Sequence, residues 1–150
     1  MENLSVLNSK ERKGLYSMME TQYGCTFGED YEIYMNSANK IFIINKDIAR
    51  INLSALRINS FGLYAGEIYN GYLRLSFDGA ILLGKKATKG ILDLTDDLAE
   101  RWSKGEDVVV DSDLHGYMIV RSGGDILGCG KLANKKLYNY VPKERRFNNT

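Results

Sequence analysis

The sequence predicts an α+β protein in which a small N-terminal α/β domain precedes a β-rich domain with short helices. Three observations support this fold class: a helical apolar pattern near the N-terminus, a tight-turn signal in the middle of the chain, and short strand-like segments separated by glycines towards its end. At 150 residues, the chain has room for one ordinary domain or two small ones. We place the domain boundary near Gly66, which gives domains at residues 1–66 and 67–150.

The first helix is indicated at both of its ends. Asn8 and Glu11 have the spacing of a capping box, in which each side chain bonds to the other residue's backbone N–H. Apolar residues continue at helical spacing to Tyr23, and Gly24 suits the left-handed conformation that ends a helix. We expect three further elements in this domain, namely a hairpin of two strands, a short helix and an irregular connection, at residues 31–35 with 40–44, 47–53 and 61–66.

The second domain is predicted to open with a hairpin, because Asn70-Gly71 readily adopts the positive φ angles of a type I′ turn. A short helix capped by Asp78 and a lysine-rich loop should follow. Another helix is expected after Thr95, with Trp102 on its apolar side. The remaining segments are short strands, typical of a small barrel or sandwich, at residues 91–94, 107–110, 117–121, 126–131 and 137–141.

The sequence lacks the signals of several protein classes. Its apolar runs are far shorter than the ~20 residues that span a bilayer, and no signal-peptide pattern opens the chain, so we expect a cytoplasmic protein with no membrane association. Cys25 and Cys129 form no CxxC pair and His115 is the single histidine, which disfavours metal, disulfide and Ser-His-Asp sites. The GxGxxA match at residues 128–133 is not followed by a helical segment. We expect no metal, no cofactor and no catalytic activity.

Charge is distributed unevenly along the chain although the formal net charge is only +1. Residues 91–113 hold eight acidic and two basic side chains, whereas residues 131–150 hold six basic and one acidic. The basic segment interleaves cations with aromatic rings, a combination that neutralises phosphates and stacks on unpaired bases in RNA-binding proteins. The predicted RNA contacts, including one stacking tyrosine, are Lys85, Lys86, Lys89, Lys136, Tyr138, Lys143, Arg145 and Arg146, with Tyr140 a second candidate for stacking.

Several stretches resemble the PUA domain. Ser76-Phe77-Asp78-Gly79-Ala80 opens a helix after a strand, and Lys104-Gly105-Glu106-Asp107-Val108 leads into a central strand. Asp125-Ile126-Leu127-Gly128-Cys129-Gly130 resembles the glycine-punctuated strand that helps to close the PUA pseudobarrel. The ending, residues 136–146, resembles archaeal PUA proteins related to the tail of Sun-type RNA cytosine methyltransferases. Residues 1–66 resemble the small α/β pre-PUA domain of ribosome-biogenesis factors.

This resemblance implies a protein that binds structured tRNA or rRNA, in ribosome biogenesis or as the RNA-targeting component of a modification system. Its partners would be RNA and a separate RNA-modifying enzyme or ribosome-assembly proteins. In the family, RNA is held by segments that correspond here to residues 84–90 and 128–146. Two alternatives stay open: a protein-interaction module that docks a basic partner on the acidic segment 91–113, and an enzyme.

Overall fold

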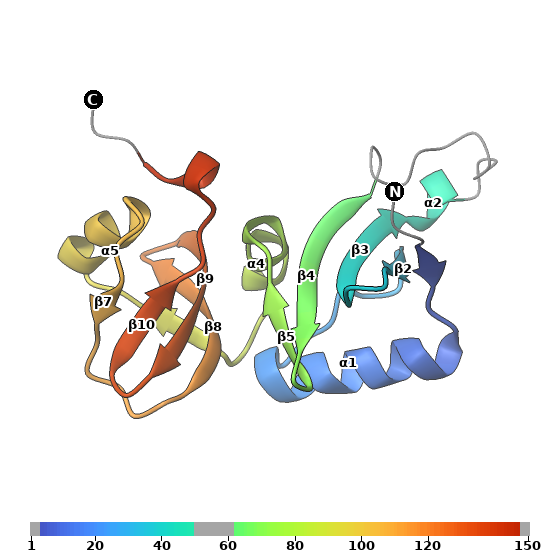
Figure 1. Ribbon diagram of the computed structural model, residues 1–150, viewed down its shortest axis with the longest axis horizontal. Coiled ribbons are helices and arrows are strands. Elements are labelled where there is room, and N and C mark those ends of the chain that lie inside the picture. Colours follow the sequence, from blue (N-terminus) through green and yellow to red (C-terminus); the bar gives the residue numbers. More distant parts are fainter. Residues whose placement is uncertain (1–3, 50–61, 148–150) are drawn as a thin grey trace.

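The computed structural model describes residues 4–49 and 62–147, which form two five-stranded sheets with short helices around them (Figure 1). The first sheet is antiparallel and keeps its strands in chain order. Its strands are β1 (Ser5–Val6), β2 (Tyr31–Met35), β3 (Lys40–Asn45), β4 (Leu63–Tyr69) and β5 (Tyr72–Leu75). Helix α1 (Ser9–Tyr23) runs below this sheet in Figure 1, and the short helix α2 (Lys46–Ala49) follows β3.

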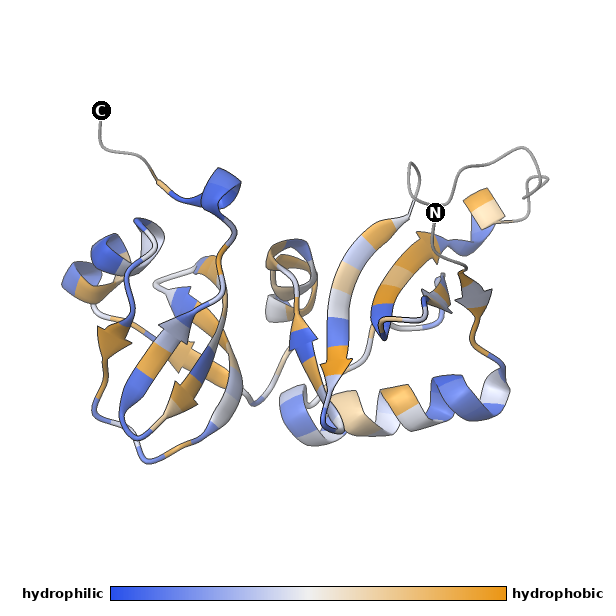
Figure 2. Cartoon of the chain, in the orientation of Figure 1, coloured by the Kyte–Doolittle hydropathy of each residue, from blue (hydrophilic) through white to orange (hydrophobic). Residues whose placement is uncertain are grey.

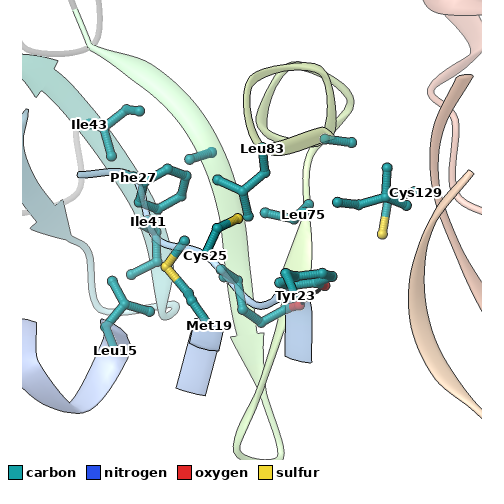
Figure 3. Close-up of a cluster of buried hydrophobic side chains, with 14 of the residues drawn as sticks. Leu15, Met19, Tyr23, Cys25, Phe27, Ile41, Ile43, Leu75, Leu83 and Cys129 are labelled. Atoms are coloured by element: carbon teal, nitrogen blue, oxygen red, sulfur yellow. Dashed lines mark hydrogen bonds between the residues drawn. The ribbon is translucent and has the colours of Figure 1, made fainter. Parts of the chain in front are cut away.

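Helix α1 begins and ends where the sequence predicts. The Asn8 side chain accepts from the Glu11 backbone N–H at 2.8 Å, and the Glu11 side chain accepts from the Asn8 N–H at 3.0 Å, so the capping box is confirmed. Gly24 ends the helix with φ at +71°. Leu15, Met19 and Tyr23 point from α1 into the first core, where they meet strand residues (Figure 3). The Tyr23 hydroxyl donates to the Leu73 carbonyl at 2.6 Å, which fixes α1 to β5.

The second sheet has the strand order β6-β8-β9-β10-β7 and curls into a half-barrel, so the α+β class and the PUA-like pseudobarrel are confirmed. Only β6 and β8 pair in parallel among its described strands. The strands are β6 (Ile91–Asp93), β7 (Val108–Val109), β8 (Gly116–Ser122), β9 (Asp125–Ala133) and β10 (Lys136–Asn139). Helix α5 (Asp96–Ser103) buries Trp102 completely in the core of this sheet.

Figure 2 shows the same division by hydropathy, with apolar residues along the strands of both sheets and polar residues over most of α5 and the C-terminal turn. Helix α4 (Phe77–Gly84) lies between the two sheets and contacts both β4 and β9. Ile119 and Cys129 of the second sheet also enter the first core, so the two halves share a packed boundary.

Three expectations differ from the structure. The irregular connection at 61–66 is instead strand β4 from Leu63 onwards, because pairing with β3 and β5 satisfies its backbone despite Gly66. Gly66 lies inside β4, so the change of sheet occurs after β5, later than the boundary we predicted. Helix α4 is capped by Ser76, whose Oγ accepts from the Gly79 N–H at 2.9 Å, and not by Asp78.

The helix expected over 47–53 is described only to Ala49, and the rest of that range lies outside the described residues. The Asn70-Gly71 hairpin is confirmed, with φ angles of +50° and +82°. Within residues 4–49 and 62–147, no helix has the length and apolar character needed to cross a membrane.

Candidate RNA interface

The loop lysines Lys85, Lys86 and Lys89 follow α4 and lie against the end of α1. The backbone N–H groups of Thr88 and Lys89 donate to the Tyr23 carbonyl at 2.9 and 3.2 Å, which anchors the loop. All three lysine side chains are exposed, and none makes an ion pair with a described carboxylate. Their charge is therefore free to attract a polyanion.

The tail residues are held differently. Arg145, in the short 3-10 turn η2 (Lys143–Arg145), donates to both carboxylate oxygens of Asp78 at 2.8 and 2.9 Å and lies over the Phe77 ring at 4.8 Å. Arg146 donates to the Val141 carbonyl at 3.1 Å. Both arginines thus fasten the tail, and the charge of Arg145 is offset, whereas Lys143 is exposed without a described ion-pair partner.

The two predicted basic segments are separated by α4. Arg145 contacts the first turn of this eight-residue helix, whereas Lys85 and Lys86 follow its last residue, about 12 Å further along the axis. No hydrogen bond or ion pair between described residues joins the two groups, as each is held by other parts of the fold. Lys136 lies apart from both, in β10, where its ammonium is over the Tyr138 ring at 5.0 Å. Whether these residues contact RNA stays a prediction.

A second group of cations and rings comes together on the half-barrel. Tyr117, Lys131 and Tyr138 are directly opposite one another on the adjacent strands β8, β9 and β10. Directly paired residues of antiparallel strands point to the same side of a sheet. The Lys131 ammonium lies 5.8 Å from the Tyr117 ring centre, and Lys136 lies over Tyr138 two residues along the same strand. The three strands therefore present alternating rings and cations.

The first sheet extends this group. The Arg74 guanidinium of β5 lies over the Tyr140 ring at 5.0 Å, and Tyr140 meets Tyr117 edge to face with ring centres 6.2 Å apart. Burial, followed by the nearby Tyr140, raises the pKa of Tyr117, so its phenol is neutral at physiological pH. We name this group the aromatic–cation face; it comprises Arg74, Tyr117, Lys131, Lys136, Tyr138 and Tyr140.

Sequence reasoning missed Arg74, Tyr117 and Lys131. The alternation of Lys136, Tyr138 and Tyr140 was visible, since residues two apart share a face of a strand. The register that brings Tyr117 opposite Lys131 joins strands whose pairing the sequence does not specify. Arg74 comes from the other sheet, so no local pattern identifies it.

The acidic segment 91–113 is largely paired within the chain. Asp93 makes two hydrogen bonds with Arg121, at 2.7 and 2.9 Å, which lower the Asp93 pKa. Lys135 binds the next acidic pair, Asp111 and Asp113, at 3.2 and 3.0 Å. Further pairs join the acidic and basic side chains Glu100–Lys104 and Glu106–Arg101. Five of the eight acids are thus ion-paired and share four cations, whereas Asp96, Asp97 and Asp107 have no described ion pair.

The described residues contain no group of three or more His, Cys, Asp or Glu side chains placed to hold a metal. Cys25 and Cys129 are buried and unpaired. Burial raises the pKa of the Cys129 thiol to about 12, so it stays protonated and acts as a small apolar side chain.

The second sheet and the tail have recognisable relatives. Residues 89–147 match the family described as the methyltransferase RsmF PUA domain. Residues 89–147 are therefore similar to a PUA domain of that kind. The match begins at Lys89 and takes in every strand of the half-barrel, α5 and the turn that holds Arg145 and Arg146.

Curated proteins similar to this chain agree with the family match. The chain is 33% identical over 90 residues to ribosomal RNA small subunit methyltransferase F of Aeromonas salmonicida, covering 59% of this chain and 19% of the relative. It is 29% identical over 92 residues to the protein of the same name from Vibrio vulnificus, covering 61% and 20%. A third relative of that name, from Aliivibrio salmonicida, is 21% identical over 140 residues, covering 93% and 29%.

The chain therefore spans about a fifth of the length of the first two relatives. The longer match to the Aliivibrio protein also takes in most of the first sheet. The PUA resemblance, including its likeness to Sun-type methyltransferases, is confirmed.

Proposed function

We propose that this protein binds ribosomal RNA in the cytoplasm and directs an RNA-modifying activity to it, as part of ribosome biogenesis. The observation that carries the proposal is the PUA-like region at residues 89–147, which carries all of the aromatic–cation face except Arg74 and is bordered by loop lysines that have no described ion-pair partner. The relatives are named for small-subunit ribosomal RNA, which favours rRNA over tRNA as the ligand.

The described residues supply cations and rings for binding, with no arrangement of acid, base and nucleophile among them. We therefore propose that these 150 residues recognise RNA and that the modification chemistry comes from elsewhere, either a separate modifying enzyme or another region of polypeptide. Ribosome-assembly proteins are the second class of partner that this role implies.

The protein-interaction alternative has less support. A basic partner would need exposed and unmatched acids on segment 91–113. Asp93, Asp111 and Asp113 already bind cations of the chain, so only Asp96, Asp97 and Asp107 are exposed acids without a described ion pair. A competing basic protein would have to break these pairs, whereas RNA meets loop lysines that have no described carboxylate partner. RNA is thus the better match to the distribution of charge.

Reversing the charge of two loop lysines is expected to weaken RNA binding. The double variant Lys86→Glu with Lys89→Glu should bind fragments of small-subunit rRNA at least about tenfold more weakly, because two phosphate contacts become repulsive. Fluorescence anisotropy with labelled fragments at fixed salt measures the change. These lysines are a cleaner test than Arg145 and Arg146, whose replacement would also release the tail.

The matched control is Lys10→Glu with Lys13→Glu. These exposed lysines lie in the first turns of α1, whereas the loop packs against the other end of this 15-residue helix, about 15–20 Å away. Both double variants change the net charge equally. Equal losses in the two would show that only bulk charge matters, and an unaffected Lys86/Lys89 variant would rule out the loop as a contact.

A further inference from the structure

We propose that the aromatic–cation face binds an unpaired RNA strand, with bases stacked on its tyrosines and phosphates held by its lysines, since Arg74 is paired with Glu67 at 3.6 Å. This inference rests on the proposed RNA-binding function. It adds the class of RNA that is bound and the surface that binds it. The residues that carry it are Arg74, Tyr117, Lys131, Tyr138 and Tyr140.

The rings and cations of this face form one continuous series. Arg74 lies over Tyr140, Tyr140 meets Tyr117, and Lys131 lies over Tyr117 with Tyr138 opposite it on the next strand. The series crosses three strands of the half-barrel and reaches β5 of the first sheet. A bound strand would thus follow the junction between the two sheets.

The position of the face follows from the pleat of the half-barrel. Side chains two residues apart on a strand share one face. Ile119 and Cys129 are paired across β8 and β9 and are buried in the first core. Tyr117 and Lys131, two residues along the same strands, therefore stand on the same face at the edge of that core. The packed boundary holds them in place before any ligand arrives.

Several of these rings remain open to solvent. Tyr138 and Tyr140 are 40% and 41% exposed, although tyrosines that serve only to fill a core are covered. The β4–β5 hairpin adds Tyr69 and Tyr72, a directly paired couple that is 53% and 58% exposed. Tyr69 also lies close enough to Tyr117 to influence its phenol electrostatically. Exposed rings gather at one place where no described apolar segment covers them.

The chemistry of this series selects unpaired nucleotides over a duplex. Base faces are hidden inside a double helix but are free to stack on aromatic rings in a single strand. Tyr117 and Tyr138 lie two strands apart, so their backbones are separated by about 10 Å. A stacked single strand that rises about 3.4 Å per nucleotide would span this distance with roughly three nucleotides. Lys131 lies between the two tyrosines, where a phosphate of the bridging backbone would pass.

A cleft of about 420 Å³ adjoins the same face beside Arg74 and Tyr140. Its walls include Tyr64 from the first sheet and Ser76 with Asp78 from the start of α4. The volume falls in the range of small-ligand sites. The Ser76 Oγ and both Asp78 carboxylate oxygens already bond within the fold, so a bound base would meet the cleft mainly through its aromatic walls, Tyr64, Phe77 and Tyr140. The end of the stacked strand therefore has a place for one base turned out of the stack.

Binding of a ten-nucleotide single-stranded RNA, compared with its duplex, tests the proposal. The wild-type protein should bind the single strand at least about tenfold more tightly. Tyr138→Ala with Tyr140→Ala should weaken single-strand binding by about 30-fold or more, because each lost stacking contact costs about fivefold or more. The matched control, Tyr138→Phe with Tyr140→Phe, keeps both rings and should bind within about twofold of wild type.

The outcomes separate this inference from the proposed function. Equal binding of single strand and duplex, or an alanine pair that binds like wild type, overturns the stacking face; loss of binding in the Lys86/Lys89 variant would then still support RNA recognition. Absence of RNA binding by the wild-type protein overturns both. The preference for the single strand is measured on the unmodified chain, so the test holds even if the alanine pair fails to fold.

Discussion

Replacing Trp102 with alanine is expected to lower the free energy of unfolding by about 3–5 kcal/mol. The side chain is fully buried, and its ring fills the centre of the half-barrel core. Its Nε1 donates to the Leu127 carbonyl at 3.1 Å, and a Cβ on Gly130 would lie only 2.5 Å from the ring. Alanine would leave a large cavity beside β9, next to Lys131 of the aromatic–cation face. Urea denaturation followed by circular dichroism measures the loss.

Two control variants separate cavity formation from other effects. Trp102→Phe keeps most of the ring volume and should lose less stability than the alanine variant. Val109→Ala removes a side chain that is 71% exposed and should change stability by no more than about 0.5 kcal/mol. A Trp102→Ala protein as stable as the Val109→Ala protein would contradict the assigned core.

Alanine at Gly79 is expected to destabilise the protein by at least about 2 kcal/mol. Gly79 lies in α4 where the helix meets β4, and an added Cβ would lie 2.1 Å from the Ala65 carbonyl oxygen. That oxygen belongs to the backbone and already accepts from the Ser76 N–H at 2.9 Å, so it has little freedom to move. The helix would be displaced from the sheet that it joins to the half-barrel.

The same substitution at Gly14 should have the opposite sign. Gly14 lies inside α1, and an added Cβ would meet no atom within 4 Å. Alanine there should stabilise the protein by about 0.5–1 kcal/mol, because glycine loses more conformational freedom in a helix. Thermal unfolding of the two variants beside wild type measures both shifts. Stability losses of similar size at the two positions would show that the close contact of α4 with β4 is not the cause.

The sequence was most informative where one local feature decides the structure. The capping box of Asn8 and Glu11 needs only four residues, and the positive φ angles of Asn70-Gly71 follow from the chemistry of those two residues. Such elements form in the same way whatever packs around them, so α1 and the β4–β5 turn were predicted correctly.

The sequence was least informative where distant segments decide. Strand β4 contains Gly66, where a Cβ would lie 2.5 Å from the Arg74 carbonyl oxygen, so the glycine marks a close approach of two strands instead of a loop. The N-cap of α4 was predicted two residues too late, because Ser76 and Asp78 are both good capping residues.

The candidate site also has features that the sequence shows and features that only the tertiary fold determines. Clusters of charge are visible along the chain, but Arg145 is bound to Asp78, 67 residues earlier, and this pairing depends on the tertiary fold. The ring and cation series of Tyr117, Lys131 and Arg74 depends on strand register and on the contact between sheets. Composition thus indicated the chemistry of the surface, whereas the fold decides which side chains share it.

The salt dependence of rRNA binding tests the central claim most directly, since phosphate contacts release counterions when they form. With a handful of contacts from the loop lysines and the aromatic–cation face, the logarithm of the binding constant should fall linearly with the logarithm of salt concentration, with a slope of about −3 to −5. Affinity that depends on phosphate contacts falls steeply between about 50 and 200 mM salt. A slope near zero over that range would contradict recognition of RNA by these cations.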